Sequence, residues 1–169
     1  MNDFNVPGDA EFAKLVEELA LLLSARGWRL ATAESCTGGW IAKCCTDRDG
    51  SSGWFERGYV TYGYAAKVEA LGVDAGILES VGAVSREVAL QMAEGARRHS
   101  GMDIAVAVTG IAGPGGGMPD KPVGTVWFGW SLKGRAPDSE VCHFSGDRDN
   151  VRRQTVVHAL QGLIDRLTP

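Results

Sequence analysis

One short stretch of the chain, residues 103–109, restricts the possible folds more than any other. Its centre is the apolar run Ile104-Ala105-Val106-Ala107-Val108. Because successive side chains of a strand point to opposite faces of a sheet, a strand without polar residues must be buried on both faces. Such strands occur in mainly parallel sheets that are covered by helices on both sides. We therefore predict an α/β fold built around this strand.

The rest of the chain supplies the helices and further strands that such a sheet needs. The predicted order is helix, strand, helix, strand, helix, helix, strand, strand, strand, helix, which is typical of α/β domains. Helices are expected at residues 9–27 with Asp9 as N-cap, from Thr37 or Gly38 onward, at 65–72, 74–80 and 85–100, and after a cap at Asp147 or Asp149; strands are expected at 28–33, 59–62, 103–109, 124–132 and 139–145. The short link between the last two strands indicates a hairpin, which makes one strand antiparallel. Residues 1–169 then form a single domain with a core from about 10 to 168 and a mixed, mainly parallel sheet of about five strands.

Composition excludes several classes of protein. Apolar residues make up 44% and charged residues 22% of the 169 residues, which is typical of a folded globular domain. The net charge of −4 argues against a nucleic-acid partner, and the pairs Arg97-Arg98 and Arg152-Arg153 are interpreted as solvated helix faces. No run of about 18 apolar residues predicts a membrane span, and residues 1–8 show no secretory signal.

The cysteines bear on the cellular compartment. Cys36, Cys44, Cys45 and Cys142 match no zinc-binding spacing, and a disulfide between the adjacent Cys44 and Cys45 would be strained. Reduced thiols in a cytoplasmic protein are the simplest interpretation.

The most informative polar motif is Ala31-Thr32-Ala33-Glu34-Ser35-Cys36-Thr37-Gly38-Gly39. It lies where a predicted strand ends and a helix begins, and ligands usually bind at the carboxyl ends of such strands. We predict that Ser35 is a nucleophile, which requires a nearby base. The three histidines lie on predicted helices or in mid-strand, and no Gly-x-Ser-x-Gly elbow is present, so a hydrolase triad is disfavoured.

Lys67 is the better candidate for the base. It follows the second predicted strand, at the start of a short helix, and neighbouring strands would bring it close to Ser35. Burial against Tyr62, Tyr64 and Ala66 would lower its pKa towards the working range. The alternative is an ordinary solvated lysine. Cys36 is a rival nucleophile, for which we favour the interpretation of a buried structural thiol.

Three further segments are candidate ligand-binding sites. The backbone N–H groups of Thr37, Gly38 and Gly39 could stabilise an oxyanion or phosphate, or the glycines could simply form a tight turn. Thr109 and Gly110 open a long glycine-rich loop, residues 110–123, that lacks the P-loop and dinucleotide spacings but permits close approach to a ligand. Arg148, at the start of the last helix, could bind an anion such as phosphate or pair with Asp147 or Asp149.

Four segments taken together resemble the CinA C-terminal domain family. They are residues 32–39, residues 50–55, residues 109–114 with 121–126, and residues 144–148 with 151–153. The resemblance implies a three-layer α/β/α sandwich that hydrolyses the carboxamide of nicotinamide mononucleotide, giving nicotinate mononucleotide and ammonia. It implies a catalytic pair of Ser35 and Lys67, assisted by Tyr62, and no metal or other cofactor. In the mechanism we then expect, Thr37, Gly38, Gly39, Thr109 and Gly110 surround the carbonyl and Arg148 holds the phosphate.

One departure from the family keeps other functions open. Family members commonly have Tyr-Ser-Asn where this chain has Tyr62-Gly63-Tyr64. The loss of two polar groups favours one alternative, a non-catalytic nucleotide-binding or regulatory module. A third interpretation is an amidase for a different pyridine amide or a pyrrolidone-like substrate. A small-molecule nucleotide is the expected partner, with neither nucleic acid nor membrane, and a homodimer is the first expectation for any oligomer.

Overall fold

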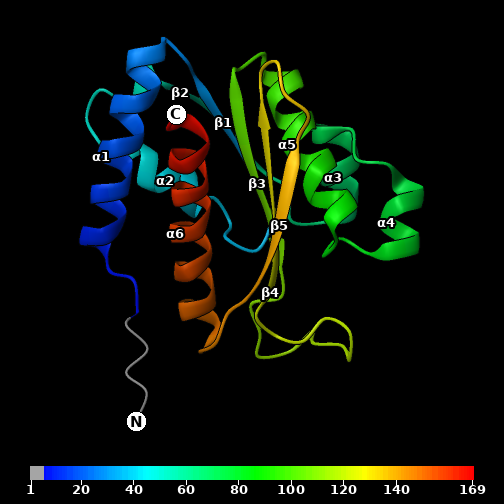
Figure 1. Ribbon diagram of the computed structural model, residues 1–169. Coiled ribbons are helices and arrows are strands. Elements are labelled where there is room, and N and C mark those ends of the chain that lie inside the picture. The colour runs from blue at the N-terminus through cyan, green and yellow to red at the C-terminus, as the bar shows by residue number, and fades with distance from the viewer. Residues whose placement is uncertain (1–5) are drawn as a thin grey trace.

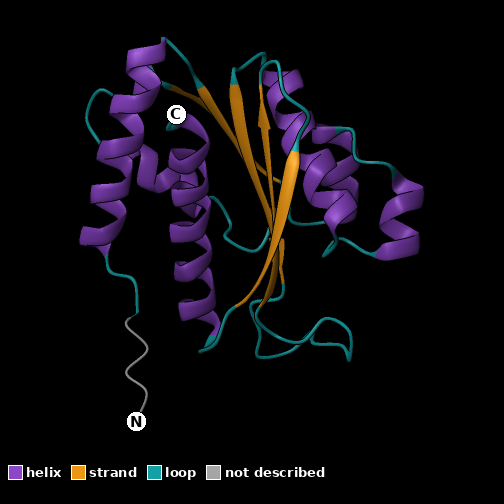
Figure 2. Cartoon of the chain, in the orientation of Figure 1, coloured by secondary structure: helices purple, strands orange, loops and turns teal. Residues whose placement is uncertain are grey.

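The structure, a computed structural model, describes residues 6–169; Met1–Asn5, part of the segment where no secretory signal is predicted, lie outside the described residues. A sheet stands between two layers of helices (Figures 1 and 2). The elements are α1 (Asp9–Arg26), β1 (Leu30–Glu34), α2 (Trp40–Thr46), a 3-10 turn (Ser51–Gly53), β2 (Phe55–Val60), α3 (Tyr64–Leu71), α4 (Ala75–Val81), α5 (Arg86–Ser100), β3 (Ile104–Gly110), β4 (Thr125–Leu132), β5 (Asp138–His143) and α6 (Arg148–Leu167). None of the helices in this part of the chain combines the length and apolar character needed to cross a bilayer.

The sheet has five strands in the order β2-β1-β3-β4-β5. Strand β1 pairs in parallel with β2 and β3, whereas β4 pairs in antiparallel fashion with β3 and β5. Only β4 therefore runs against the others, and the predicted mixed, mainly parallel sheet is confirmed. The carboxyl ends of β1, β2 and β3 meet at one edge, where a site is expected.

Strand β3 is buried on both faces, as its apolar run predicts. Ile104, Val106 and Val108 face the layer of α1, α2 and α6, while Ala105 and Ala107 face α5 and its neighbours. Figure 1 shows α1, α2 and α6 on one side of the sheet and α3, α4 and α5 on the other. The large residues on one face and the small ones on the other let α5 pack closely, and the three-layer sandwich follows from this division.

Several element boundaries differ from those predicted. Strand β2 covers Phe55–Val60, not residues 59–62, because polar residues are tolerated on its exposed side at the edge of the sheet. Helix α2 starts at Trp40, not at Thr37 or Gly38, because Gly38 and Gly39 adopt left-handed backbone conformations with φ of 60° and 98°.

Other boundaries shift less. Gly8, not Asp9, is the N-cap of α1, and β1 ends at Glu34, immediately before Ser35. Of the two predicted caps of α6, Asp147 is the one used, and its carboxylate accepts the N–H of Asn150 at 2.9 Å. The predicted glycine-rich loop begins one residue later, because Gly110 still belongs to β3; residues 111–123 contain no helix or strand, and an isolated bridge joins Met118 to Lys121.

Helix α3 carries Lys67 and is fixed against α5 by a close backbone contact. A Cβ at Gly95 of α5 would lie 1.9 Å from the carbonyl oxygen of Leu71, so only glycine permits this approach. Leu71 lies one turn after Lys67 on α3. Gly63 is the N-cap of α3, with extended backbone (φ −90°, ψ 165°) and no side chain to cap the helix. The departure from the family's Tyr-Ser-Asn thus falls at a helix cap.

We expect Gly63→Ser to stabilise the protein slightly and to leave its chemistry unchanged. A serine at this N-cap supplies the missing hydrogen bond, which is worth a few tenths of a kcal/mol relative to glycine, roughly 0.3. The backbone there suits any residue, and an added Cβ meets no atom within 4 Å. Urea unfolding tests the stability and turnover tests the chemistry; a large change in turnover would contradict a purely capping role.

Candidate active site

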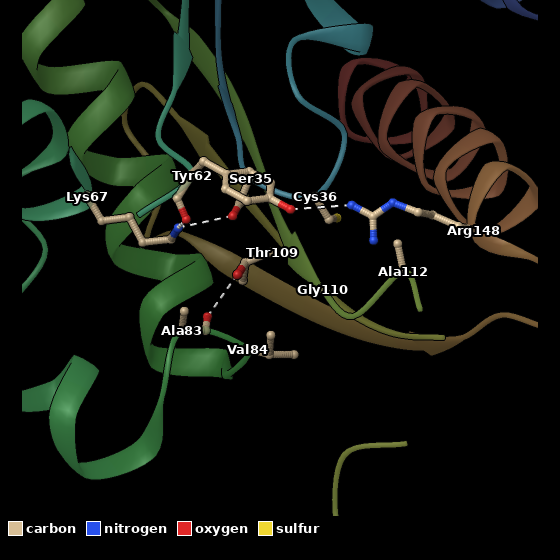
Figure 3. Close-up of a pocket in the computed structure, with 10 residues that line it drawn as sticks. All are labelled: Ser35, Cys36, Tyr62, Lys67, Ala83, Val84, Thr109, Gly110, Ala112 and Arg148. Carbon is tan, nitrogen blue, oxygen red and sulfur yellow. Dashed lines mark hydrogen bonds between the residues drawn. The ribbon is translucent and has the colours of Figure 1, made fainter. Parts of the chain in front are cut away.

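A cavity of about 180 Å³ lies at the carboxyl ends of β1 and β3. Its walls come from the turn after β1, the end of β3 and the loop that follows it, α3 and the segment before it, the turn before α5 and the start of α6 (Figure 3). The residues that line it are Ser35, Cys36, Tyr62, Lys67, Ala83, Val84, Thr109, Gly110, Ala112 and Arg148. Six of the nine predicted site residues therefore meet in one cavity; the other three are Thr37, Gly38 and Gly39.

Ser35 extends β1 by one hydrogen bond and then begins a tight turn. Its N–H donates to the Val108 carbonyl at 3.1 Å, which continues the pairing of β1 with β3. Its carbonyl accepts the N–H of Gly38, also at 3.1 Å. The sheet and the turn thus fix the backbone of Ser35 on both sides, and its side chain faces Lys67 (Figure 3).

Lys67 is fully buried and reaches Ser35 directly. Its Nζ lies 3.0 Å from Ser35 Oγ, 2.6 Å from the Thr61 carbonyl oxygen and 3.2 Å from that of Tyr62. Both carbonyls lie just beyond β2, where Thr61 N–H donates to the Glu34 carbonyl. Within residues 6–169 no carboxylate forms a salt bridge with Lys67. The alternative of a solvated lysine is wrong.

Burial without a counter-charge lowers the pKa of Lys67 to about 8. A substantial fraction of the amine is then neutral near physiological pH. A neutral amine has two N–H hydrogens and one lone pair. The two carbonyl oxygens can accept both hydrogens, which leaves the lone pair for the hydroxyl proton of Ser35. The geometry suits general-base activation of a serine.

Cys36 is not a competing nucleophile. Burial raises the pKa of its thiol to about 12, so the reactive thiolate is scarce at neutral pH. The interpretation of Cys36 as a buried thiol is confirmed, and all four cysteines are free.

The three histidines also lie outside the cavity. His99 contacts the Ala70 carbonyl, His143 lies near Thr125, and His158 pairs with Glu140.

Glu34 is a buried residue beside the site that the sequence interpretation did not single out. Its carboxylate is fully buried and accepts hydrogen bonds from the N–H groups of Ile41 (2.7 Å) and Ala42 (3.0 Å) and from the hydroxyl of Thr37 (2.7 Å). Burial raises the pKa of Glu34, although these hydrogen bonds oppose the shift. Glu34 therefore ties the turn after Ser35 to the start of α2. A carboxylate at the end of an otherwise apolar strand was the available signal.

The structure places Thr37, Gly38 and Gly39 outside the walls of the Ser35 cavity. They line a separate surface hollow with Trp40 and Arg152. The N–H of Gly38 already donates to Ser35, and both glycines have positive φ. Of the two predicted alternatives, a tight turn and not an anion site describes Gly38 and Gly39. Thr37 belongs to the same turn and lies two residues after Ser35.

Thr109 and Gly110 close the cavity at the end of β3. The Thr109 hydroxyl donates to the Ala83 carbonyl at 2.9 Å and so fixes the turn before α5. A Cβ at Gly110 would lie 2.7 Å from Val126 Cγ2, so glycine is needed there for packing against β4. The backbone of Gly110 thus closely approaches the neighbouring strand β4, whereas the sequence suggested a close approach to a ligand.

Arg148 and Tyr62 bridge the mouth of the cavity. Arg148 Nη1 donates to the Gly113 carbonyl at 2.8 Å, and Nη2 donates to the Tyr62 hydroxyl at 3.3 Å (Figure 3). The predicted alternative of an ion pair with Asp147 or Asp149 is wrong, because Asp147 caps α6 and Asp149 pairs with Arg153 at 2.8 Å. Two of the five guanidinium N–H groups are used, so the others can bind an anion.

Comparisons with known proteins identify the family of this chain. Residues 12–167 match the CinA C-terminal domain family. A relative from Escherichia coli (strain K12), named nicotinamide-nucleotide amidohydrolase PncC, is 51% identical over 156 residues, which cover 92% of this chain and 94% of that protein. A relative of the same name from Pseudomonas putida is 55% identical over 136 residues, or 80% and 84% of the two chains.

A solved structure shares the whole fold. The competence/damage inducible protein CihA from Agrobacterium tumefaciens superposes with a TM-score of 0.91 and 43% sequence identity. The superposition covers 96% of this chain and 98% of that chain.

We expect burial of Lys67 to make stability depend on pH. The folded protein releases this proton near pH 8, whereas the unfolded chain keeps it up to about the ordinary value of 10.5. Between these values the unfolded state binds more protons, so the free energy of unfolding rises with pH, by up to about 3 kcal/mol.

Lys67→Met provides the reference for this measurement, because it removes the titrating amine and keeps a side chain of similar length. The difference in unfolding free energy between the wild type and this variant should rise from pH 8 to pH 10.5. A constant difference across that range would contradict a lowered pKa.

Proposed function

The chain belongs to the CinA C-terminal domain family, and we propose that it is a nicotinamide-nucleotide amidohydrolase with Ser35 as nucleophile and Lys67 as base. The reaction is hydrolysis of the carboxamide of nicotinamide mononucleotide to nicotinate mononucleotide and ammonia. The observation that carries the proposal is the 3.0 Å contact between Ser35 Oγ and a buried lysine that has no counter-charge. Two relatives that match most of this chain carry the name of this activity.

The proposed first step forms an acyl-enzyme. Neutral Lys67 takes the hydroxyl proton as Ser35 Oγ attacks the carboxamide carbon. The tetrahedral intermediate then collapses; its C–N bond breaks, and Lys67 returns the proton to the leaving nitrogen, which departs as ammonia. In the second step, Lys67 takes a proton from water as the water oxygen attacks the ester. Ser35 leaves with that proton, and nicotinate mononucleotide is released.

The backbone N–H groups of Cys36 and Thr37 are the best candidates to stabilise the oxyanion. They follow the nucleophile in the turn, and neither donates to a backbone carbonyl within residues 6–169. The Gly38 N–H, by contrast, is already used by Ser35. Preorganised amides of this kind stabilise the charge that develops on the carbonyl oxygen. We therefore assign the oxyanion to Cys36 and Thr37, nearer to Ser35 than the glycines.

Arg148 and Tyr62 are proposed to bind the nucleotide. Arg148 is held by Gly113 at the cavity mouth and retains free donors for the 5′-phosphate. Tyr62 has a relative exposure of 64% and lines the same cavity as Ser35, where its ring can contact the pyridine or ribose (Figure 3).

The alternative of a non-catalytic binding module gains no support from the site. Gly63 and Tyr64, where the family pattern is lost, do not line the cavity. Tyr64 instead accepts the N–H of Ala83 at 3.3 Å. A buried amine costs stability, and binding alone gives no reason to place it against a serine hydroxyl. Ammonia release from the mononucleotide, the riboside and nicotinamide, measured in parallel, separates this activity from an amidase for another pyridine amide.

A cytoplasmic location with reduced thiols and a homodimeric assembly remain predictions of the sequence.

We expect Ser35→Ala to abolish ammonia release, lowering kcat by at least about 10³-fold while substrate affinity changes little. The hydroxyl is the proposed nucleophile, so no other group can form the ester. Ser80→Ala is a suitable control because Ser80 is exposed on α4. Ammonia release measures turnover, and equilibrium dialysis measures binding. Substantial turnover by Ser35→Ala would refute the assignment.

We expect Arg148→Ala to discriminate between substrates with and without phosphate. KM for the mononucleotide should rise on the order of 10- to 100-fold, since a charge-assisted contact is lost, whereas the riboside should react as in the wild type. Steady-state kinetics with both substrates provides the comparison. An equal loss with both would show that Arg148 does not bind the phosphate.

A further inference from the structure

Arg152 does not belong to a solvated helix face, contrary to the interpretation of the Arg152-Arg153 pair. It lies on α6, one turn after Arg148, and is partly buried. Its Nε donates to the Cys36 carbonyl at 3.0 Å and its Nη2 donates to the Thr37 carbonyl at 3.1 Å. The guanidinium also lies over the ring of Trp40, 5.2 Å from its centre. A single side chain thus binds two successive carbonyls of the turn that follows Ser35.

This contact controls the direction of backbone N–H groups. In a trans peptide the C=O of one residue and the N–H of the next point in opposite directions. Arg152 draws the Cys36 carbonyl towards α6, so the N–H of Thr37 must point away from α6. The Ser35 carbonyl is held by Gly38 and fixes the N–H of Cys36 in the same manner. The orientation of both proposed oxyanion donors therefore depends on how the carbonyls of this turn are held.

The turn is held from two sides, by the carboxyl group of Glu34 and by the guanidinium of Arg152. Glu34 binds its inner side and the start of α2, as described above. Arg152 binds the carbonyls on the other side. A planar guanidinium presents two parallel N–H groups that match two neighbouring oxygens, whereas a lysine ammonium is a single point charge. This match explains why an arginine is suited to the position.

We propose that Arg152 is a positioning residue for the reaction, which does not touch the substrate. Through the Cys36 carbonyl it fixes the Thr37 N–H as an oxyanion donor, and through the Thr37 carbonyl it supports the Gly38 N–H that holds the Ser35 carbonyl and so sets the Cys36 N–H. The inference rests on the proposed function for its substrate. It assigns to Arg152 a role separate from that of Arg148, which lines the cavity.

Arg153 provides a matched control. It follows Arg152 on the same helix and lies over the same Trp40 ring, at 5.0 Å. Its guanidinium, however, bonds the Pro7 carbonyl and pairs with Asp9 and Asp149 instead of the turn. Arg153→Ala therefore removes one positive charge and the ring contacts of Arg153 with Trp40 and Phe12, without releasing the carbonyls after Ser35.

The test compares Arg152→Ala, Arg152→Lys and Arg153→Ala in the full chain. For Arg152→Ala we expect kcat with nicotinamide mononucleotide to fall on the order of 10²- to 10³-fold, the usual effect of losing an oxyanion donor, with KM within about twofold. The rise of kcat/KM with pH should keep its midpoint near the Lys67 pKa of about 8, because the base is untouched. Arg152→Lys should lose at least about tenfold, since it cannot bind both carbonyls, and Arg153→Ala should stay within about twofold of the wild type.

Two further measurements separate positioning from mere folding. Added guanidinium ion should partly restore kcat of Arg152→Ala, which a collapsed site would not permit. Thermal unfolding should show both alanine variants folded at the assay temperature; if Arg152→Ala does not fold, Arg152→Lys carries the comparison. A KM effect alone, a displaced pH midpoint, or equal kcat in Arg152→Ala and Arg153→Ala would overturn the inference.

Labelling with a serine-reactive fluorophosphonate tests the role of Arg152 independently of which substrate the enzyme hydrolyses. Its reaction with Ser35 also develops negative charge on an oxygen beside the turn, whichever amide the enzyme hydrolyses. We expect Arg152→Ala, and not Arg153→Ala, to slow this labelling. If the wild type is labelled in this pattern but does not hydrolyse nicotinamide mononucleotide, the substrate is wrong and the positioning role stands. Equal labelling of the two variants would overturn the role itself.

Discussion

The contact between a buried amine and a serine hydroxyl is the interaction on which this site depends. Lys67 is withdrawn from water without a carboxylate to compensate, so its protonated form is destabilised. Other interactions in the fold must offset the free energy that burial of this amine costs. The fold does so with two backbone carbonyls beyond β2 and with a helix held against α5 at Gly95, where no side chain fits. The instability of the charged lysine is thus what makes it useful as a base.

The doubly covered sheet explains why the groups converge. Strands β1 and β3 are neighbours and parallel, so Ser35 and Thr109 emerge at the same edge. Helix α6 packs on one face of the sheet and brings Arg148 to the cavity, and α3 approaches from the other face with Lys67 (Figure 1). The proposed nucleophile, base and anion-binding group therefore come from three different layers. The turn after Ser35 lies between them, held by Glu34 and, in our proposal, by Arg152.

Much of this arrangement could be predicted from the sequence. The apolar run of β3 gave the fold class, and the position of Ser35 and Lys67 after successive strands indicated that they meet. Edge strand β2 was misplaced because Glu56 and Arg57 are polar, and only its exposed position in the sheet makes them acceptable.

The remaining parts of the site could not be predicted from the sequence. The carbonyls of Thr61 and Tyr62 are backbone groups, which any residue provides. Arg152 and Arg153 are adjacent arginines that the sequence alone does not distinguish. Only the packing of α6 shows that Arg152 binds the turn, whereas Arg153 pairs with carboxylates. The phosphate-binding role of Arg148 and the assignment of the oxyanion donors remain proposals that kinetics can decide.

The central claim is that burial lowers the pKa of Lys67 to about 8, so that part of the amine is neutral near physiological pH, and the titration of Lys67 itself tests this most directly. The chain has five lysines, so ¹⁵N or ¹³C labelling of lysine gives few signals by NMR, and Lys67→Met identifies the one that belongs to Lys67. We expect that signal to titrate with a pKa of about 8. A midpoint near the ordinary value of 10.5 would show that Lys67 stays charged at neutral pH and would contradict its role as the base.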